Sequence, residues 1–323
     1  MAGQPVNTID RVYTEYIWFS YDDFKIRSKI KILNRVNNNL ELPLLCYDGY
    51  KTNEIKEKNT NREIVLKPWA MYNNPFKNIN LNGKNDKYLI LCDSIKNNES
   101  KKSYRLLLDD FIKQNNIKSK IQFGLEFLIK SDVSNNDDYC SVNNGNNIIT
   151  DFLNELIEKT ENINANLSEL YKINSEKYIL ITEKFTPIIS CNNLLIIKFL
   201  MEKISEKYNI AIKYNSYCAL KIFISDNETE KKDGLNNILD KINKCKDNHS
   251  EIDKVLEDLK FLNLTYKNSN LNFGIGNKST VINIPILTKI ANRGNFVYNK
   301  INSYSDPFLA AYLILSMFYK KIE

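Results

Sequence analysis

Two short stretches of this 323-residue sequence carry residue types whose spacing could serve chemistry. The run SDVSNNDDY places Asp132, Asp137 and Asp138 close together, and clustered carboxylates are the ligands that hard divalent cations prefer. The run GIGNKS, residues 274–279, has the glycines and the lysine of a phosphate-binding loop, although so short a motif is weak evidence by itself. The competing interpretations are a solvated loop for the acidic run and a solvated surface lysine for Lys278.

A third stretch, NRGNFVYNKINSYSDPF at residues 292–308, reads as a loop that leads into a helix. Asp306 can cap the first helical turn, Pro307 suits the first helical position, and an apolar run to Tyr319 follows. The loop has no carboxylate before Asp306 and no arginine after Arg293. It is therefore either an ordinary surface loop or a catalytic loop whose working residues have been replaced.

The cysteines and the histidine form no metal centre by spacing. The cysteines stand singly, without a CxxC pair, and the one histidine, His249, lies in a polar stretch. Several thiols stand inside apolar runs such as LILCD, where a thiol behaves as a small hydrophobic side chain. The cysteines are Cys46, Cys92, Cys140, Cys191, Cys218 and Cys245.

The composition is that of a globular protein, with 43% hydrophobic and 26% charged residues, and the length is sufficient for two domains. The net charge of +6 is spread over scattered lysines, which favours a solvated surface over a nucleic-acid groove. No secretory signal precedes the first strand, and no apolar run approaches the roughly 20 residues of a membrane span. We therefore expect a reduced, cytoplasmic protein that does not enter a membrane.

Hydrophobic periodicity predicts a β-rich first part and a mixed second part. TEYIWFSY and RSKIKIL flank DDFK, which predicts a hairpin, and further strands are expected in LPLLCYDGYKT, NREIVLKPWAMY and KYLILCD. Later in the chain, SYRLLLDDFIKQNN and NLLIIKFLMEKISEKYN have helical spacing, whereas KIQFGLEFLIKS and TVINIPI read as strands. The segment before Lys184 is poorly marked. The predicted fold class is α+β, in two unequal domains.

The order of these landmarks resembles that of the eukaryotic-type glutamine synthetase family. EYIWFSYDDFKIRSKIKIL, LPLLCYDGYKT, IVLKPWAMYNNPF and KYLILCD match in order the motifs of its N-terminal β-grasp domain. QFGLEF is similar to its WFGxEQEY strand, and residues 292–308 are similar to its KKGYFEDRRPSANCDPF segment. The resemblance implies a β-grasp domain over residues 1–98 and a larger, catalytic-type domain of antiparallel sheet and helices over residues 99–323.

The resemblance also implies a chemistry, in which ammonia is joined to glutamate through a γ-glutamyl phosphate made from ATP. Carboxylates would hold the Mg²⁺ or Mn²⁺ ions, and arginines would bind the substrate carboxylate and the phosphoryl group in bidentate fashion. The family's site positions that are retained here are Glu126, Asn215 and Asp48. Glu126 could still bind one cation or could pair with a lysine, and Asp48 is equally explained as the first residue of an Asp-Gly turn.

The other site positions of the family carry different residue types in this sequence. Its glutamates fall on Leu128, Asn166, Lys267 and Val297. Its histidine falls on Leu220, and its arginines fall on Lys278, Asn283 and Asn299. By this resemblance, residues 292–308 keep the frame of a catalytic loop without its charged groups.

We consider three hypotheses for function. The leading one is a degenerate glutamine synthetase-like pseudoenzyme with a structural, scaffolding or regulatory role. It would need no cofactor, would form a homo-oligomer or join a large protein or ribonucleoprotein complex, and would come from a reduced genome. The second is an active glutamate–ammonia or other γ-glutamyl ligase with an altered site, which would require ATP and Mg²⁺ or Mn²⁺. The third is a basic RNA-binding module, which the stretches KIRSKIK and KINKCK would serve.

Overall fold

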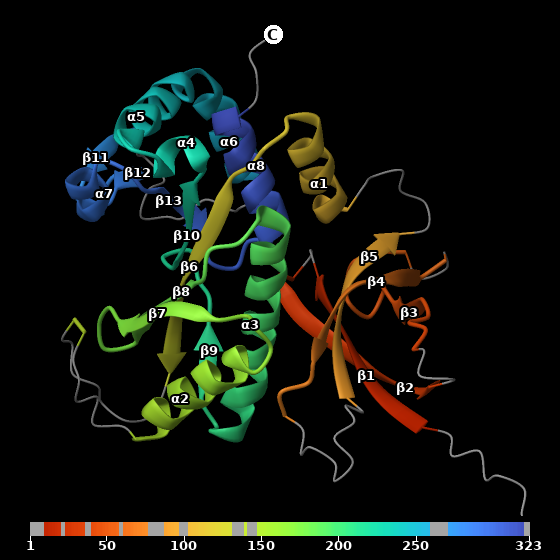
Figure 1. Cartoon of the computed structure of the whole chain (residues 1–323). Helices are drawn as coiled ribbons and strands as arrows, with labels where there is room; N and C mark the ends of the chain where they lie inside the picture. The colour runs from red at the N-terminus through yellow and green to blue at the C-terminus, as the bar shows by residue number, and fades with distance from the viewer. Residues whose placement is uncertain are drawn as a thin grey trace, which may run out of the picture. The chain divides into compact units, whose positions relative to one another are not determined.

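The computed structural model describes residues 10–20, 23–35, 40–57, 61–76, 87–96, 103–130, 139–140, 147–258 and 271–319. The chain separates into two compact units, Met1–Ser103 and Tyr104–Glu323 (Figure 1). The boundary expected from the sequence lies between residues 98 and 99.

The first unit is built on a five-stranded sheet in the order β2-β1-β5-β4-β3. β1 and β2 form the predicted antiparallel hairpin, and β5 runs parallel to β1. One face of the sheet carries the core of this unit, where Tyr16, Trp18 and Ile90 are buried, as expected for strands whose side chains alternate between two faces. The strands are β1 (Asp10–Ser20), β2 (Lys25–Arg35), β3 (Leu45–Asp48), β4 (Glu63–Asn73) and β5 (Lys87–Lys96).

The second unit contains an eight-stranded sheet in the order β11-β12-β13-β10-β6-β8-β7, with β9 paired to β6. Its strands are β6 (Lys120–Lys130), β7 (Leu167–Lys172), β8 (Lys177–Thr182), β9 (Ala211–Lys213), β10 (Ala219–Ser225), β11 (Phe273–Ile275), β12 (Ile282–Ile284) and β13 (Phe296–Asn302). Its helices are α1 (Tyr104–Gln114), α2 (Asn147–Glu161), α3 (Pro187–Lys207), α4 (Asn227–Glu230), α5 (Gly234–Lys244), α6 (Lys246–Asp258), α7 (Ile286–Ala291) and α8 (Pro307–Tyr319). Both sheets contain parallel and antiparallel pairs, and the α+β class predicted from the sequence is confirmed.

The long helix α3 packs against the sheet of the second unit (Figure 1). Its sequence is apolar around most of its circumference, as is typical of a helix that is buried on several sides. The hydroxyl of Ser190 donates to the carbonyl of Ile121 on β6 at 2.8 Å, and the thiol of Cys191 lies 3.3 Å from the carbonyl oxygen of Pro307 on α8. These contacts fix α3 between the central strand and the last helix.

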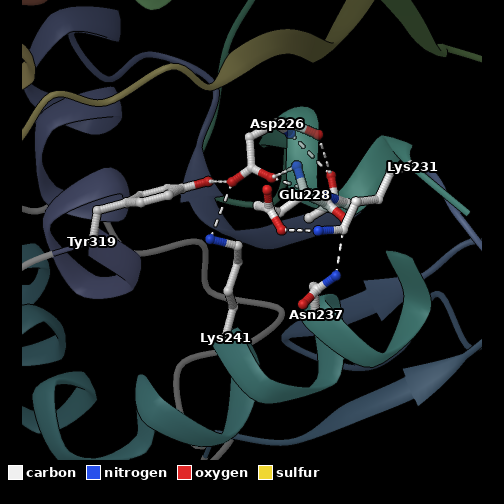
Figure 2. A network of polar contacts seen from close by, with 7 residues as sticks. Asp226, Glu228, Lys231, Asn237, Lys241 and Tyr319 are labelled. Atoms are coloured by element: carbon white, nitrogen blue, oxygen red, sulfur yellow. Dashed lines mark hydrogen bonds and ion pairs between the residues drawn. The ribbon is translucent and has the colours of Figure 1, made fainter. Parts of the chain in front are cut away.

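Helix α8 is held at both ends. At its start, the carboxylate of Asp306 accepts a hydrogen bond from the backbone N–H of Leu309 at 2.8 Å, which confirms the cap predicted from the sequence. At its end, the Tyr319 hydroxyl donates to Asp226 Oδ2 at 2.6 Å, and Lys241 Nζ lies 3.1 Å from the same oxygen (Figure 2). Asp226 also caps α4 by accepting from the backbone N–H of Thr229 at 3.0 Å, so one carboxylate joins α4, α5 and α8.

One expectation about local structure is wrong. Residues 296–302, read from the sequence as a loop, form the fully buried strand β13. The polar residues in this strand mask its β pattern, but they have partners: Lys300 pairs with Asp253, and Asn299 donates to the Thr280 carbonyl at 3.0 Å. The poorly marked segment before Lys184 contains the strand pair β7 and β8. Within the described ranges, no helix combines the length and the apolar character that a bilayer crossing requires.

Candidate functional site

The candidate site lies on one face of the larger sheet, which we call the Glu126 face. Along β6 the side chains alternate, and Ile121, Phe123, Leu125, Phe127 and Ile129 are completely buried. Glu126 points to the opposite side of the strand from these residues. Gly124 lies on the same face as Glu126. The side chains nearest to it are those of Phe223 and Lys221 on β10 and Ile179 on β8, which a Cβ at Gly124 would contact.

Two lysines from the flanking strands hold the carboxylate of Glu126. Lys221 Nζ on β10 lies 2.8 Å from Oε1, and Lys177 Nζ on β8 lies 3.2 Å from Oε2. The backbone N–H of Ala219 donates to Oε2 at 3.0 Å, and Lys177 also donates to the carbonyl of Tyr217 at 2.8 Å. Both carboxylate oxygens therefore already have a cationic partner.

These contacts decide the charge state of Glu126. Burial by itself raises the pKa of a carboxyl, but the ion pair and hydrogen bond with Lys221, the Ala219 N–H and the Lys177 charge outweigh burial. The pKa of Glu126 consequently lies below its ordinary value, and the side chain is an anion matched by two cations. Of the two alternatives considered from the sequence, the structure shows the pairing with lysine.

Sequence reasoning missed both lysines, although each leaves a trace. Lys221 interrupts the apolar run ALKIFIS in a strand whose other residues are mostly buried, and Lys177 opens the run KYILIT. A lysine within a buried strand requires a partner, because an unpaired buried charge is costly. The partner, Glu126, is 51 residues from Lys177 in the sequence, so spacing alone could not identify it.

The end of the sheet formed by β12 and β13 carries neutral residues at the positions singled out from the sequence. Val297 is opposite Phe223 on β10 and Asn283 on β12, and it is almost fully buried. The side-chain amide of Asn299 donates a hydrogen bond to the Thr280 carbonyl. The buried Oδ1 of Asn283 has no hydrogen-bond partner among the described residues. A valine and two amides provide no charge with which to bind a metal ion or a phosphate.

Of three further positions, Leu128 lies beside Glu126 on the Glu126 face, Asn166 precedes β7, and Leu220 lies on the core side. Leu128 is opposite Lys177 on β8 and Lys213 on β9. The Asn166 amide donates to Glu183 Oε2 at 3.2 Å, just before β7. Leu220 is opposite Leu125 and is completely buried, so it belongs to the core side of the sheet and not to the Glu126 face.

Aromatic side chains lie beside the Glu126 face near β7. Tyr171 is opposite Ile179, which is itself opposite Glu126. Its ring meets that of Tyr139 edge-on at 5.7 Å, and Lys278 Nζ lies 5.9 Å from the centre of the Tyr139 ring. Burial is the main cause that raises the pKa of Tyr171, so this phenol stays neutral at ordinary pH.

Asn215 and Asp48 have structural explanations. Asn215 Oδ1 accepts from the backbone N–H of Tyr217 at 3.0 Å, which stabilises the turn before β10. Asp48 Oδ1 accepts from the N–H of Tyr50 at 3.0 Å, and Oδ2 lies 3.6 Å from Arg62. A Cβ at the following Gly49 would lie 2.6 Å from the Ile64 side chain, so a larger residue there would have to displace Ile64.

Four further candidates lie outside the described residues. They are Lys267 and, in the acidic run, Asp132, Asp137 and Asp138. Among the residues that are described, no group of three or more His, Cys, Asp and Glu side chains could hold a metal ion. The described part of the Glu126 face thus does not fit a divalent-metal site.

Comparison of the sequence with known proteins identifies glutamine synthetases over a limited stretch. Glutamine synthetase 1, mitochondrial, of Drosophila melanogaster is 37% identical over 86 residues, which is 26% of this chain and 20% of the fly protein. The glutamine synthetase nodule isozyme of Lupinus angustifolius is 30% identical over 89 residues, or 27% of this chain and 26% of the lupin protein. The matched stretch thus spans about a fifth to a quarter of these relatives. No family model matches the chain.

Comparison of the structure extends the likeness to nearly the whole chain. The glutamine synthetase of Plasmodium falciparum superposes with a TM-score of 0.65 over 96% of this chain and 72% of that protein, at 13% sequence identity. The superposition establishes a common fold. Because the sequence identity is so low, it establishes nothing about the site, which has to be judged from the residues of this chain.

Proposed function

The shared stretch of sequence and the common fold support membership of the glutamine synthetase family, and on that premise we propose that this chain is a pseudoenzyme. In this proposal it has lost the ligands for metal, ATP and glutamate, and serves a structural, scaffolding or regulatory binding role. The loss would be concentrated on the Glu126 face, while the packing side of the same sheet keeps its pattern.

The single observation that carries the proposal is the occupation of Glu126 by Lys177 and Lys221. A magnesium ion needs near-octahedral oxygen ligands, and the two ammonium groups would have to move away before Glu126 could supply one. They would also repel the incoming cation, because two positive charges near the carboxylate leave the cluster with a net positive charge. Both carboxylate oxygens of Glu126 are therefore already engaged in ion pairs within the chain.

The neutral end of the sheet supports the same conclusion. Val297 and Asn299 stand where the resemblance expects a metal-binding glutamate and an arginine, and Asn283 stands where it expects a second arginine. Removing one group that stabilises a transition state typically costs about 2.7–4 kcal/mol, or 10²–10³ in rate. Several such groups would be missing here, although their losses need not add.

A titration with metal and nucleotide tests the proposal. Purified protein would be titrated by calorimetry with Mn²⁺ and then with ATP in the presence of Mg²⁺, and glutamine formation from glutamate and ammonia would be assayed in parallel. We expect no heat of binding at millimolar ligand and no glutamine above the rate without protein. E126Q is the matched control, because any metal signal that survives in it does not arise at this site.

The opposite result has a clear form. Binding of two metal ions that is abolished in E126Q, together with ATP-dependent glutamine formation, would show that Lys177 and Lys221 give way and that the chain is an active ligase.

A role without catalysis has to be exerted through binding, so the proposal includes an assembly. We propose that the chain forms a homo-oligomer or joins a larger assembly. Mass photometry of the protein alone, and of the protein mixed with a catalytically active glutamine synthetase, would measure this directly. A sample that remains monomeric in both conditions would contradict this part of the proposal.

A further inference from the structure

Five exposed apolar residues of the second unit lie at one end of its sheet, and they include the two most exposed large hydrophobic residues among those described. Leu287 and Ile290 on α7 are 73% and 74% exposed, and Ile286 is 51% exposed. Phe273 and Ile275 on the adjacent strand β11 are 40% and 38% exposed. We call these five residues the α7 patch. Such exposed apolar patches on a protein surface mark sites of interaction.

The members of the α7 patch are held side by side. β11 pairs in parallel with β12, which places Ile275 opposite Ile284, two residues before α7 begins. The N–H of Gly276 donates to the Ile284 carbonyl at 2.8 Å, and a Cβ at Gly276 would lie 3.8 Å from that of Ile286. The patch therefore runs continuously from the edge strand onto the helix.

Helix α7 presents Ile286, Leu287 and Ile290 outward together with Lys289, whereas Thr288 faces the interior. Thr288 is buried, and its hydroxyl donates to the Asn295 carbonyl at 3.0 Å. The chain then turns sharply: Asn292 is left-handed, and Gly294 has a φ of 143° with the Thr288 hydroxyl 2.7 Å from where its Cβ would be. Three large apolar side chains of this short helix therefore face solvent, and leaving them exposed has a cost unless another surface covers the patch.

The charges around the patch indicate the chemistry of that other surface. From Leu259 to Ser305 the sequence contains no Asp or Glu, whereas it contains five lysines and one arginine. Lys289 on α7 and Arg293 just beyond it are exposed, and within the described residues neither forms an ion pair. The carboxylate of Asp233 touches the helix cap, where it accepts from Asn292 Nδ2 at 2.7 Å. The edge that faces solvent is consequently apolar with a positive rim.

We propose that the α7 patch docks an acidic amphipathic segment of a partner protein. Apolar side chains of that segment would cover Leu287, Ile290 and Phe273, and its carboxylates would pair with Lys289 and Arg293. β11 is also the last strand of the sheet among the described residues, so an extended segment could add to its edge. The inference concerns a surface away from Glu126, and it holds whether or not the chain is a pseudoenzyme.

A protein partner fits this surface better than a lipid one. Anionic membranes attract proteins through clusters of about four to eight lysines and arginines, each contributing only about 1 kcal/mol near the surface. Two such residues, Lys289 on α7 and Arg293 just beyond its cap, border the α7 patch, and two are fewer than such a cluster contains.

Selection from a random peptide library tests the proposal without knowledge of the natural partner. A phage-displayed library would be selected on the full chain, with the L287D/I290D double variant as the counter-selection target. We expect enriched peptides to combine two or more large apolar residues with Asp or Glu.

In fluorescence anisotropy with one such peptide, we expect L287D/I290D and the charge-reversal variant K289E/R293E each to weaken binding at least about tenfold, or about 1.4 kcal/mol. I148D, at an exposed isoleucine on α2, is the matched control and should bind as the wild type does.

Four results would overturn the proposal. The first is enrichment of basic or uncharged peptides, or of none that depend on Leu287 and Ile290. The second is binding to vesicles containing phosphatidylserine that L287D/I290D abolishes, which would assign the patch to a lipid surface. The third is self-association that the same variant abolishes, which would assign it to a second copy of this chain. The fourth is a melting temperature lowered by several degrees in L287D/I290D, which would show that the chain covers the patch itself.

Discussion

The two faces of strand β6 differ in the kind of side chain they carry. On the α3 side, Phe123, Leu125 and Phe127 are completely buried and alternate without interruption. On the other side, Gly124, Glu126 and Leu128 share their face with lysines from β8 and β10. One face is organised by packing, and the other is organised by a single carboxylate and the cations around it.

The difference teaches how far a fold constrains each side of a sheet. A packing face must keep its volume and apolar character, since core substitutions that change either are destabilising. A face that carries buried polar groups is constrained mainly to give each of them a partner. Lys177 and Lys221 supply the partners of Glu126 from within the chain. The polar residues of this face can therefore differ between proteins while the sheet stays the same.

Truncation on the packing side should have the largest effect. F123A removes a completely buried ring from the centre of the sheet, and we expect it to lower the free energy of unfolding by about 3–5 kcal/mol. Q122A is the control on the same strand, because Gln122 is partly exposed and contributes one hydrogen bond, to the Thr182 carbonyl at 3.1 Å. Urea denaturation would compare the two, and similar losses would mean that the two faces do not differ as described.

Breaking the ion cluster on the other face should cost less. E126Q leaves two lysines beside a neutral amide, and we expect a loss of about 3 kcal/mol, the lower end for breaking a buried pair, because the lysines are partly exposed. The triple variant E126Q/K177M/K221M should recover part of this loss, since the unpaired cations are removed as well.

The pH dependence of the same variant sharpens the comparison. The folded-state pKa of Glu126 lies below its ordinary value of 4.5, so the stabilisation is complete above that pH and is lost as the pH falls through the depressed pKa. The stability difference between wild type and E126Q, from urea melts at several pH values, should therefore shrink on acidification. A difference that stays constant from neutral pH to pH 3 would contradict the ionised state of Glu126.

Much of the fold could be predicted from the sequence wherever its signals are local. The β1–β2 hairpin follows from two β-branched runs around a short turn, and the start of α8 follows from Asp306 and Pro307. The alternation of QFGLEF places Glu126 on the face opposite Phe123 and Phe127. By contrast, β13 was missed because Asn299, Lys300 and Asn302 are polar although buried, and their partners lie on other elements.

The site was harder to predict because its contacts join distant segments. The motif order selected Glu126, and the residues alone left open whether it binds a cation or a lysine. Finding the lysines needed the register of β6 against β8 and β10, which places Lys177 and Lys221 beside the same carboxylate. The register also moves Leu220 to the core side, an outcome that a motif match cannot give, since a shift of one residue reverses the face.

A buried lysine on the packing side is the most direct way to challenge the comparison. Lys198 of α3 is buried, donates to the Ser303 carbonyl at 2.7 Å and lies near Asp306 and Glu202. Burial lowers its pKa to about 8, against the favourable charges of those carboxylates. Because the unfolded chain binds more protons between pH 8 and 10.5, the contribution of Lys198 to stability should rise with pH in that range. We expect wild type to gain about 2 kcal/mol relative to K198M between pH 7 and 10, as measured by urea denaturation at each pH. A flat difference would mean that Lys198 is neutral or well paired throughout.

The carboxylate network in Figure 2 gives the smallest effect and the closest parallel to Glu126. Asp226 also has two partners for one oxygen, Tyr319 and Lys241, but these sit on helices and tie α8 to the rest of the unit. Y319F removes the 2.6 Å hydrogen bond to a charged acceptor, and we expect the free energy of unfolding, measured by urea denaturation, to fall by about 1.5 kcal/mol.

Burial raises the pKa of Asp226, but the Tyr319 hydroxyl, Lys241 and the Thr229 N–H together lower it below its ordinary value of 3.8. Loss of the hydroxyl should therefore also reduce the stability that disappears as the pH falls below 3.8. Y312F, which alters a ring packed edge-on against Phe111, is the control on the same helix. If Y319F were as costly as E126Q, the two carboxylates would contribute equally to the stability of the fold, and the ion cluster at Glu126 would not differ from an ordinary structural network.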